Sequence, residues 1–257
     1  MTDSDEFFVV DAEKFDLAGT ERLFELFAVP RDDREGVWLI AFQHAAWNAS
    51  VVVPAPPVMT GPDGFPYLRL VLPPPGESFQ SNCLSNVCAF CAERGLGAAF
   101  FAKAGDPPMA LQYAIPTGVI ESLRLFASWS GDPLDDATPP EDDEAPDIGA
   151  ARRVLVGAPS PDYLPPHTAR LLRRHLVERW EMAEPRVALL VDPQLSPSRN
   201  LVIGRKLSEF ADEATAEQQM RTLLWYLPPG RSLVLMPEDW PEERLTALSS
   251  LCEGARA

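Results

Sequence analysis

The feature that most constrains the fold is a stretch of acidic residues and prolines near the middle of the chain. Residues 132–150 read DPLDDATPPEDDEAPDIGA, with eight acidic residues, four prolines and no lysine or arginine. Like charges repel one another and few of these side chains are suited to burial, so the composition is typical of a solvated linker. The alternating D-x-D-x-D-G pattern of a calcium-binding loop is missing. The sequence therefore predicts two domains, residues 1–131 and residues 151–257, joined by this acidic linker.

Composition and charge narrow the compartment and the partners. A hydrophobic content of 46% in 257 residues is sufficient for a buried core in each domain. The first residues, MTDSDEFF, are acidic and lack the apolar region of a secretory signal. The chain also has no apolar run near the roughly 18 residues that a membrane span needs. We therefore expect a cytoplasmic protein with reduced cysteines. The net charge of −16 argues against nucleic acid or an anionic membrane as a partner.

Three of the four cysteines lie close together in a pattern that is also found in iron–sulfur proteins. Cys83, Cys88 and Cys91 form a C-x4-C-x2-C array within residues 81–95, SNCLSNVCAFCAERG. A cluster of that kind needs an irregular loop and a fourth ligand, yet the neighbours are Leu, Val, Ala and Phe. The remaining cysteine, Cys252, belongs to the other predicted domain, and no histidine is near enough in sequence to complete a zinc site. We consider a metal site here and reject it.

The same segment has the features of a buried helix. Leu84, Cys88 and Cys91 recur at i, i+4 and i+7, which places them on one face. Ser81 is suited to the N-cap, and Gly95 stands where the end of a helix favours a left-handed residue. The cysteines are therefore predicted to be core residues, and we expect no cofactor.

The N-terminal domain is predicted to contain a mixed or antiparallel sheet with flanking helices, hence an α+β fold. Its hairpin is indicated by Pro62, Asp63 and Gly64, which favour a tight turn between two extended runs. The expected elements are a helix over 21–27, a buried strand over 37–42, the hairpin runs 49–59 and 65–73, strands over 97–103 and 109–115, and a helix over 117–129.

The C-terminal domain reads β-α-β-β-α-β followed by one more helix, which is the order of a ferredoxin-like fold. That fold predicts one antiparallel sheet with two helices on one face. The first and third strands contain no aromatic residue, so base stacking as in an RNA-recognition motif is set aside. The expected elements are strands over 152–157, 186–192, 200–207 and 231–237, and helices over 165–182, 215–227 with a T-x-x-Q capping box at Thr215, and 242–251.

Three runs in this domain resemble a known bacterial family. They are VLVGAPSPDYLPPHTARLLRRHLVERWEMAEPRVALLVD, NLVIGRKLSEF and LPPGRSLVLMPED. With their VGAP strand end, proline-led amphipathic helix and EPRVALLV strand, they resemble the C-terminal domain of SseB-type proteins, the enhanced serine sensitivity family. The resemblance implies a regulatory or interaction protein, and it supplies no catalytic residues.

Few residues stand out as candidates for chemistry or binding. His44 and Asn48 are the pair to inspect for catalysis, although the chain has no G-x-S-x-G, H-E-x-x-H or P-loop motif. A polar residue near a buried element is usually only hydrogen-bonded there. Trp225, Tyr226 and Trp240 are candidates for a binding surface, since such aromatic residues are enriched in interfaces.

These observations favour a non-enzymatic protein that interacts with another protein or with itself as a homodimer. An acidic secretion chaperone is an alternative that the charge and size allow. A small-molecule hydrolase or transferase with its site near His44 is another.

Overall fold

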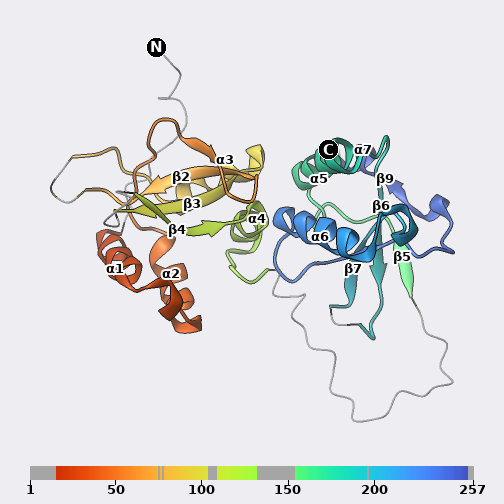
Figure 1. The fold of residues 1–257 in the computed structure, drawn as a ribbon, viewed down its shortest axis with the longest axis horizontal. Coiled ribbons are helices and arrows are strands. Elements are labelled where there is room, and N and C mark those ends of the chain that lie inside the picture. The colour runs from red at the N-terminus through yellow and green to blue at the C-terminus, as the bar shows by residue number, and fades with distance from the viewer. Residues whose placement is uncertain are drawn as a thin grey trace, which may run out of the picture. The chain divides into compact units, whose positions relative to one another are not determined.

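The computed structural model describes residues 16–74, 76, 78–103, 109–131, 154–195 and 197–253 (Figure 1). The chain divides into two compact units, Met1–Arg124 and Leu125–Ala257. The described residues form seven α-helices and two mixed sheets of four and five strands, so the predicted α+β class is confirmed. The predicted acidic linker, 132–150, lies outside the described residues.

The first unit is built on a sheet with the strand order β1-β2-β3-β4. The pairs β1/β2 and β3/β4 are antiparallel, whereas β2/β3 is parallel. The predicted hairpin is confirmed, with Gly64 at a φ of 83° in its turn. The elements are α1 (Leu17–Ala28), the 3-10 turn η2 (Arg31–Asp33), α2 (Gly36–Ala46), β1 (Val58–Thr60), β2 (Pro66–Val71), α3 (Leu84–Arg94), β3 (Gly97–Ala102), β4 (Ala110–Ile115) and α4 (Thr117–Phe126).

The predicted buried strand over 37–42 is wrong, because these residues lie in α2. Trp38 and Phe42 are buried one turn apart, while Val37 and Ile40 are 80% and 58% exposed. A short apolar run does not distinguish a strand from a buried helix by periodicity. Here the exposure follows the helical period, with one stripe directed towards the core.

An aromatic cluster joins the first two helices to the sheet. Trp38 stacks on Phe42 with ring centroids 5.3 Å apart and an interplanar angle of 2°. Phe42 meets Phe100 of β3 edge-on at 5.5 Å and Tyr113 of β4 at 4.4 Å. Phe27, from the end of α1, lies 6.5 Å from Trp38. Because Phe100 and Tyr113 are paired across the two strands, both rings face α1 and α2.

The cysteine segment forms the predicted helix, α3, which packs against β3. Gly95 adopts the expected left-handed conformation at its end, with φ 65°. The N-cap is Cys83 rather than Ser81, and no side chain caps the first turn by a hydrogen bond. Burial of Cys83 against the core fixes the start of the helix, which overrides the capping preference of a serine.

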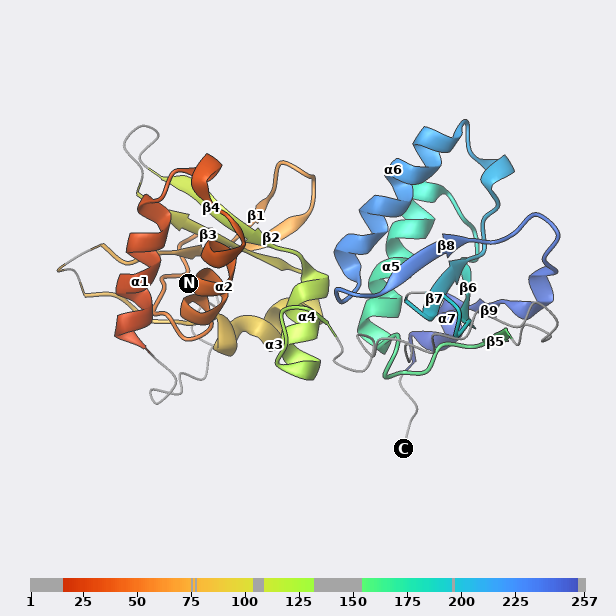
Figure 2. The same ribbon diagram turned by 90° about the horizontal axis from the view of Figure 1, so that it is seen from below.

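The second unit contains a sheet with the strand order β5-β6-β7-β8, and β9 pairs with the other end of β6. Helices α5 and α6 lie together on one side of this sheet (Figure 2). The elements are β5 (Leu155–Gly157), α5 (Pro166–Trp180), β6 (Arg186–Val191), β7 (Arg199–Ile203), the 3-10 turn η3 (Leu207–Glu209), α6 (Glu213–Leu223), the 3-10 turn η4 (Leu224–Tyr226), β8 (Ser232–Leu235), the 3-10 turn η5 (Glu242–Arg244), β9 (Thr246–Ala247) and α7 (Leu248–Leu251).

The chain order of the second unit is the predicted β-α-β-β-α-β, but the ferredoxin-like details are not confirmed. A split βαβ unit places its two parallel strands on either side of a third strand. In this sheet β5 and β6 are instead direct antiparallel neighbours, and the parallel pair is β7/β8. The sheet is therefore mixed, and its strands follow chain order across the sheet.

Two local predictions in this unit also differ from the structure. The helix predicted over 242–251 is a 3-10 turn, a short strand and a single helical turn, because β9 pairs with β6 before α7 begins. The helix α6 begins earlier than the predicted capping box, since the Asp212 carboxylate accepts a hydrogen bond of 2.6 Å from the Thr215 N–H. Asp212 is thus the N-cap, and Thr215 lies inside the first turn.

The two units share one succession of elements. In each, a helix is followed by an antiparallel hairpin, a second helix and a strand parallel to the second strand of the hairpin. The succession is α2-β1-β2-α3-β3 in the first unit and α5-β6-β7-α6-β8 in the second. The sequence patterns gave no indication of this repetition.

Candidate functional site

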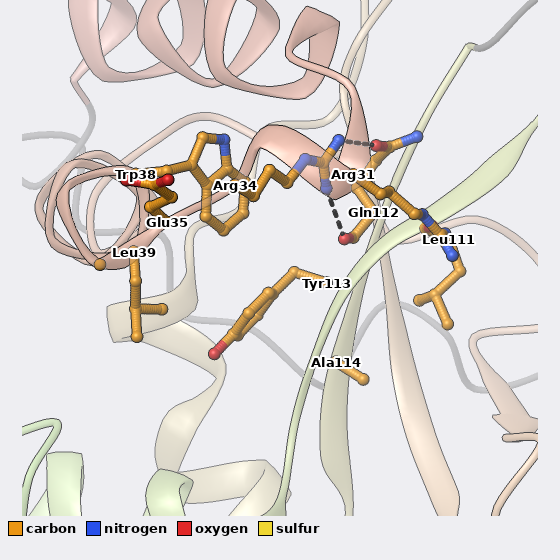
Figure 3. Close-up of a pocket in the computed structure, with 10 residues that line it drawn as sticks. Arg31, Arg34, Glu35, Trp38, Leu39, Leu111, Gln112, Tyr113 and Ala114 are labelled. Atoms are coloured by element: carbon orange, nitrogen blue, oxygen red, sulfur yellow. Dashed lines mark hydrogen bonds between the residues drawn. The ribbon is translucent and has the colours of Figure 1, made fainter.

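The candidate functional site is a groove in the first unit, between the beginning of α2 and strand β4 (Figure 3). Its volume is about 490 Å³. We call it the arginine groove, after Arg31 and Arg34, which line it together with Trp38, Gln112 and Tyr113. Two cations and two aromatic rings therefore converge beside one strand.

Arg34 is held in place by four hydrogen bonds to uncharged acceptors. Its Nε donates to the Val29 carbonyl at 3.1 Å, and its Nη2 donates to the Phe27 carbonyl at 3.2 Å. Toward β4, Nη1 donates to the Gln112 carbonyl at 3.0 Å and Nη2 to its Oε1 at 2.8 Å, the two bonds drawn in Figure 3. The guanidinium also lies 4.7 Å from the centre of the Trp38 ring. Arg34 thus joins the end of α1, where helix carbonyls are partly negative, to the edge of the sheet.

A β-bulge makes this arrangement possible. Phe100 pairs with Tyr113 and Phe101 pairs with Leu111, so Gln112 is the extra residue of β4. Bulges redirect side chains and occur often at sheet edges. Here the bulge turns both the carbonyl and the side-chain amide of Gln112 towards Arg34.

The groove carries positive charge without a matching carboxylate. Arg31 is exposed and donates from Nη2 to the Leu111 carbonyl. Burial and the neighbouring charge of Arg31 lower the pKa of Arg34. Among the described residues, no carboxylate forms an ion pair with either arginine. Glu35 also lines the groove, but Figure 3 shows its carboxylate beside Trp38 and directed away from the Arg34 guanidinium.

Two aromatic residues form the apolar wall of the groove. Trp38 is buried, and its Nε1 donates to the Leu26 carbonyl at 2.8 Å. Tyr113 is half-buried, and its ring centroid lies 5.9 Å from that of Trp38. Burial raises the pKa of Tyr113, so its hydroxyl stays protonated at neutral pH. The wall can hold apolar or aromatic groups, and the tyrosine hydroxyl can donate a hydrogen bond.

His44 and Asn48 lie near each other on and just after α2, but they do not form a common site. His44 is exposed and lines neither the arginine groove nor a second pocket of the first unit, between the segment before β1 and helix α3. The Asn48 Oδ1 accepts a hydrogen bond of 3.1 Å from the Ser85 hydroxyl, and the Trp47 carbonyl accepts one of 3.0 Å from the Ser85 N–H. Asn48 therefore joins the end of α2 to the start of α3.

The aromatic residues proposed for a binding surface are largely inside the second unit. Trp225 and Tyr226 are each 7% exposed. The Tyr226 hydroxyl lies 3.1 Å from Nδ1 of His175, and burial raises the Tyr226 pKa to about 12. Trp240 is half-buried and packs against a cluster that includes Met236. These contacts give the three aromatic residues a packing role.

The three clustered cysteines lie in the core of the first unit. Cys83, Cys88 and Cys91 are at most 3% exposed. Burial, with smaller contributions from Cys83 and Glu121, raises the pKa of Cys88 to about 12, and burial raises that of Cys91 as well. No group of three or more metal-binding side chains in the described part of the chain is placed to hold an ion. All three thiols are shielded from solvent, and the raised pKa values keep those of Cys88 and Cys91 protonated.

Sequence reasoning missed the arginine groove. The segment RDDREGVW contains Arg31, Arg34 and Trp38, but only its last two residues entered a prediction, as the start of the strand expected over 37–42. Arg31 and Arg34 are three residues apart, a spacing that places two side chains on the same side of a helical turn. This spacing is a signal that could have drawn attention to them. The bulge at Gln112 has no such signal, since it arises only when β3 and β4 pair.

The described helices also include none with the length and apolar character needed to cross a bilayer. No family model, no curated protein and no solved structure matches the chain. The resemblance to SseB-type proteins accordingly stays a prediction.

Proposed function

We propose that the protein is a non-catalytic interaction protein whose arginine groove binds an acidic, extended segment of a partner protein. The observation that carries this proposal is a pair of guanidinium groups close enough for Arg31 to lower the pKa of Arg34, with no carboxylate of the described residues paired to either. The chain has 38 acidic and 22 basic residues, so carboxylates are abundant. Two cations that no described carboxylate pairs with therefore form a site suited to an external anion.

The two arginines have different roles in this proposal. Arg34 makes four hydrogen bonds within the fold, so its charge is held in one position and its side chain loses no conformational freedom when a ligand binds. Arg31 is exposed and makes one hydrogen bond, to Leu111, which leaves donors that can reach a carboxylate. A bound carboxylate would also relieve the repulsion between the two guanidinium groups.

The shape of the site favours an extended chain. Strand β4 is an edge of the sheet, and an edge strand can accept an additional strand through main-chain hydrogen bonds. Because the Leu111 and Gln112 carbonyls already accept from Arg31 and Arg34, such pairing is confined to the rest of β4. Trp38 and Tyr113 supply an apolar wall for alternate side chains of that segment. The bulge at Gln112 limits the length over which a partner can pair regularly. We therefore expect a short segment in which carboxylates alternate with apolar residues.

Support also comes from the resemblance to SseB-type proteins, which implies an interaction or regulatory role. The proposed catalytic alternative near His44 gains no comparable support, because His44 is exposed and Asn48 is engaged with Ser85.

The proposal is tested by binding of labelled peptides, measured by fluorescence anisotropy on the full chain. An eight-residue peptide that alternates Glu and Val is expected to bind, and its Gln and Val counterpart is expected to bind at least about tenfold more weakly. Arg31→Gln should reduce affinity for the acidic peptide by about tenfold, and added salt should weaken binding. Arg22→Gln is the matched control, since Arg22 is an exposed arginine of α1 paired with Glu25 outside the groove.

Equal binding of the two peptides would contradict the proposal. So would an Arg31→Gln variant that binds as well as the Arg22→Gln control.

A further inference from the structure

A groove in the second unit lies between helix α6 and strand β8. Its volume is about 480 Å³. We call it the acidic groove, after the glutamates among its lining residues, which include Glu213, Glu217, Met220, Leu233, Leu235 and Glu238. Carboxylates and apolar side chains therefore meet beside the last strand of the sheet.

Strand β8 lies at one edge of its sheet, and among the described residues it pairs with β7 alone. Directly after β8, Met236 N donates to the Ile203 carbonyl of β7 at 3.0 Å. In a strand, alternate residues direct their main-chain groups to the same side, so Val234 also faces β7. Leu233 and Leu235 therefore direct their N–H and C=O groups to the opposite side, where a further strand can pair with them.

The side chains of Leu233 and Leu235 form the apolar floor of the acidic groove. Val234, which lies between them, packs against a cluster from β6, β7 and the segment after β8, formed by Ala188, Val202, Met236 and Leu245. Successive side chains of a strand point to opposite faces, so Leu233 and Leu235 lie on the face that α5 and α6 cover. A strand added beside β8 would place every second side chain next to these leucines and Met220 of α6.

The edge that β8 offers is short. Pro237 follows it and has no N–H, and the Pro237 carbonyl accepts a hydrogen bond of 3.1 Å from Trp240 N. Before the strand, Arg231 N donates to the Pro228 carbonyl at 3.4 Å. Regular pairing is thus limited to β8 itself, which suits a segment of about five residues.

The carboxylate of Glu238 is held beside the end of β8. It accepts hydrogen bonds of 3.0 Å from the Ser208 N–H and 2.9 Å from the Ser208 hydroxyl. These hydrogen bonds, with a smaller contribution from the charge of Lys206, lower the pKa of Glu238, which keeps it ionised at neutral pH. The Lys206 ammonium itself donates to the Glu238 main-chain carbonyl at 2.8 Å.

The charge of the acidic groove is only partly matched within the fold. Glu217 forms an ion pair with Arg221 at 2.6 Å. Among the described residues, neither Glu213 nor Glu238 forms an ion pair. A cationic side chain of a partner therefore meets complementary charge in this groove.

We propose that the acidic groove binds an extended segment of a partner protein in which apolar residues alternate with polar ones and arginine or lysine stands at the ends. The segment pairs with β8 as an additional strand. Its apolar side chains lie on Leu233, Leu235 and Met220, and a basic side chain meets Glu213 and Glu238. The inference uses no residue of the arginine groove and is independent of the proposed function.

The charge requirement is tested by fluorescence anisotropy on the full chain with a labelled peptide, Arg-Thr-Val-Thr-Val-Arg. Its counterpart with Gln in place of both Arg is expected to bind about tenfold more weakly. Glu213→Gln should weaken binding of the Arg peptide about threefold, since the pair is exposed to solvent. Glu243→Gln is the matched control, because Glu243 is an exposed glutamate of η5 that does not line the groove, and it should leave the affinity unchanged. Equal binding of the two peptides would overturn the inference.

Main-chain pairing is tested by two N-methylated forms of the Arg peptide, one methylated at both valines and the other at both threonines. Only alternate residues of an added strand face β8, so one form is expected to bind at least about tenfold more weakly than the other. Weaker binding of the methylated valines indicates antiparallel pairing, in which directly opposite residues exchange hydrogen bonds. Weaker binding of the methylated threonines indicates parallel pairing. Equal affinities of the two forms would overturn the inference.

A variant within the groove separates a partner segment from a second copy of the chain. Met220→Lys places a cation beside the leucines and is expected to abolish binding of the Arg peptide. Should this variant fail to fold, the two methylated peptides on the unmodified protein still decide the matter. A dimer in sedimentation velocity that Met220→Lys dissociates would show that a second copy occupies the groove, and it would overturn the inference.

Discussion

Replacing Arg34 is expected to loosen the first unit at two separate places. In Arg34→Ala, the carbonyls of Phe27 and Val29 lose a charged donor at the end of α1, and Gln112 loses two hydrogen bonds at the bulge of β4. The contact with the Trp38 ring is lost as well. One residue thus connects the end of a helix to the edge of a sheet, and its removal acts on both.

The magnitude follows from these contacts. A hydrogen bond to a charged group contributes about 1.5–3 kcal/mol when it is buried. Arg34 is half-buried and water can replace part of what is lost, so the four bonds together should contribute about 2 kcal/mol. The ring contact and the favourable position at the end of a helix add about 1 kcal/mol. A total near 3 kcal/mol corresponds to a decrease in melting temperature of about 10 °C for a unit of this size.

Hydrogen exchange with mass spectrometry on the full chain measures the effect locally. Peptides that cover the end of α1 and strand β4 should exchange faster in Arg34→Ala than in the unmodified protein. Arg34→Lys should lower the free energy of unfolding by about 2 kcal/mol, because one ammonium does not span the four acceptors. Arg22→Ala is the control, since its exposed ion pair with Glu25 should contribute less than about 1 kcal/mol. An Arg34→Lys variant as stable as the unmodified protein would refute the reasoning, because a positive charge at this position would then stabilise the unit without the four hydrogen bonds.

Two further predictions concern the titratable groups. Burial and the nearby Arg179 lower the pKa of His175, so the folded state favours the neutral ring. The contribution of His175 to the free energy of unfolding is therefore fully present above its ordinary pKa near 6.5, and it should be lost as the pH falls through the lowered pKa of the folded state. His175→Gln should reduce the pH dependence of unfolding measured by urea between pH 7 and 5, and an unchanged dependence would contradict this assignment. A thiol reagent should label Cys252 in the native protein before Cys88 and Cys91, because Cys252 is half-buried while the other two are in the core. Mass spectrometry of the labelled peptides decides this, and equally fast labelling of Cys88 would show that α3 opens easily.

Local patterns in the sequence were sufficient to predict those elements in which a single residue's backbone preference determines the structure. The turn around Gly64 and the left-handed Gly95 follow from residues that tolerate positive φ, and both are confirmed. The run over 37–42 failed because every residue in it is apolar or small, so the pattern did not show which face is buried. At α6, both Asp212 and Thr215 are suitable N-caps, and only the tertiary position of the chain selected Asp212.

Strand pairing and the candidate site depend on contacts between distant segments. Nothing in the runs that form β5 and β6 specifies that they pair directly with each other, so element order alone suggested a different sheet. The arginine groove likewise combines η2 with a bulged strand about 80 residues later, and Arg34 meets Gln112 only in the folded chain. The sequence shows residue types, but the close approach of two cations is a property of the fold.

The succession of elements shared by the two units has a consequence for how the chain folds. In each unit the hairpin is local, while the parallel pair must close a longer loop, since Tyr67 pairs with Gly97 and Asn200 with Ser232. Both loops contain about 30 residues, so the entropy lost in closing them is nearly the same. Contacts of similar sequence separation favour similar folding rates. During synthesis the first unit, which ends at Arg124, can therefore complete its sheet before β8 has been made, so its hairpin meets β3 before any strand of the second unit can compete with it.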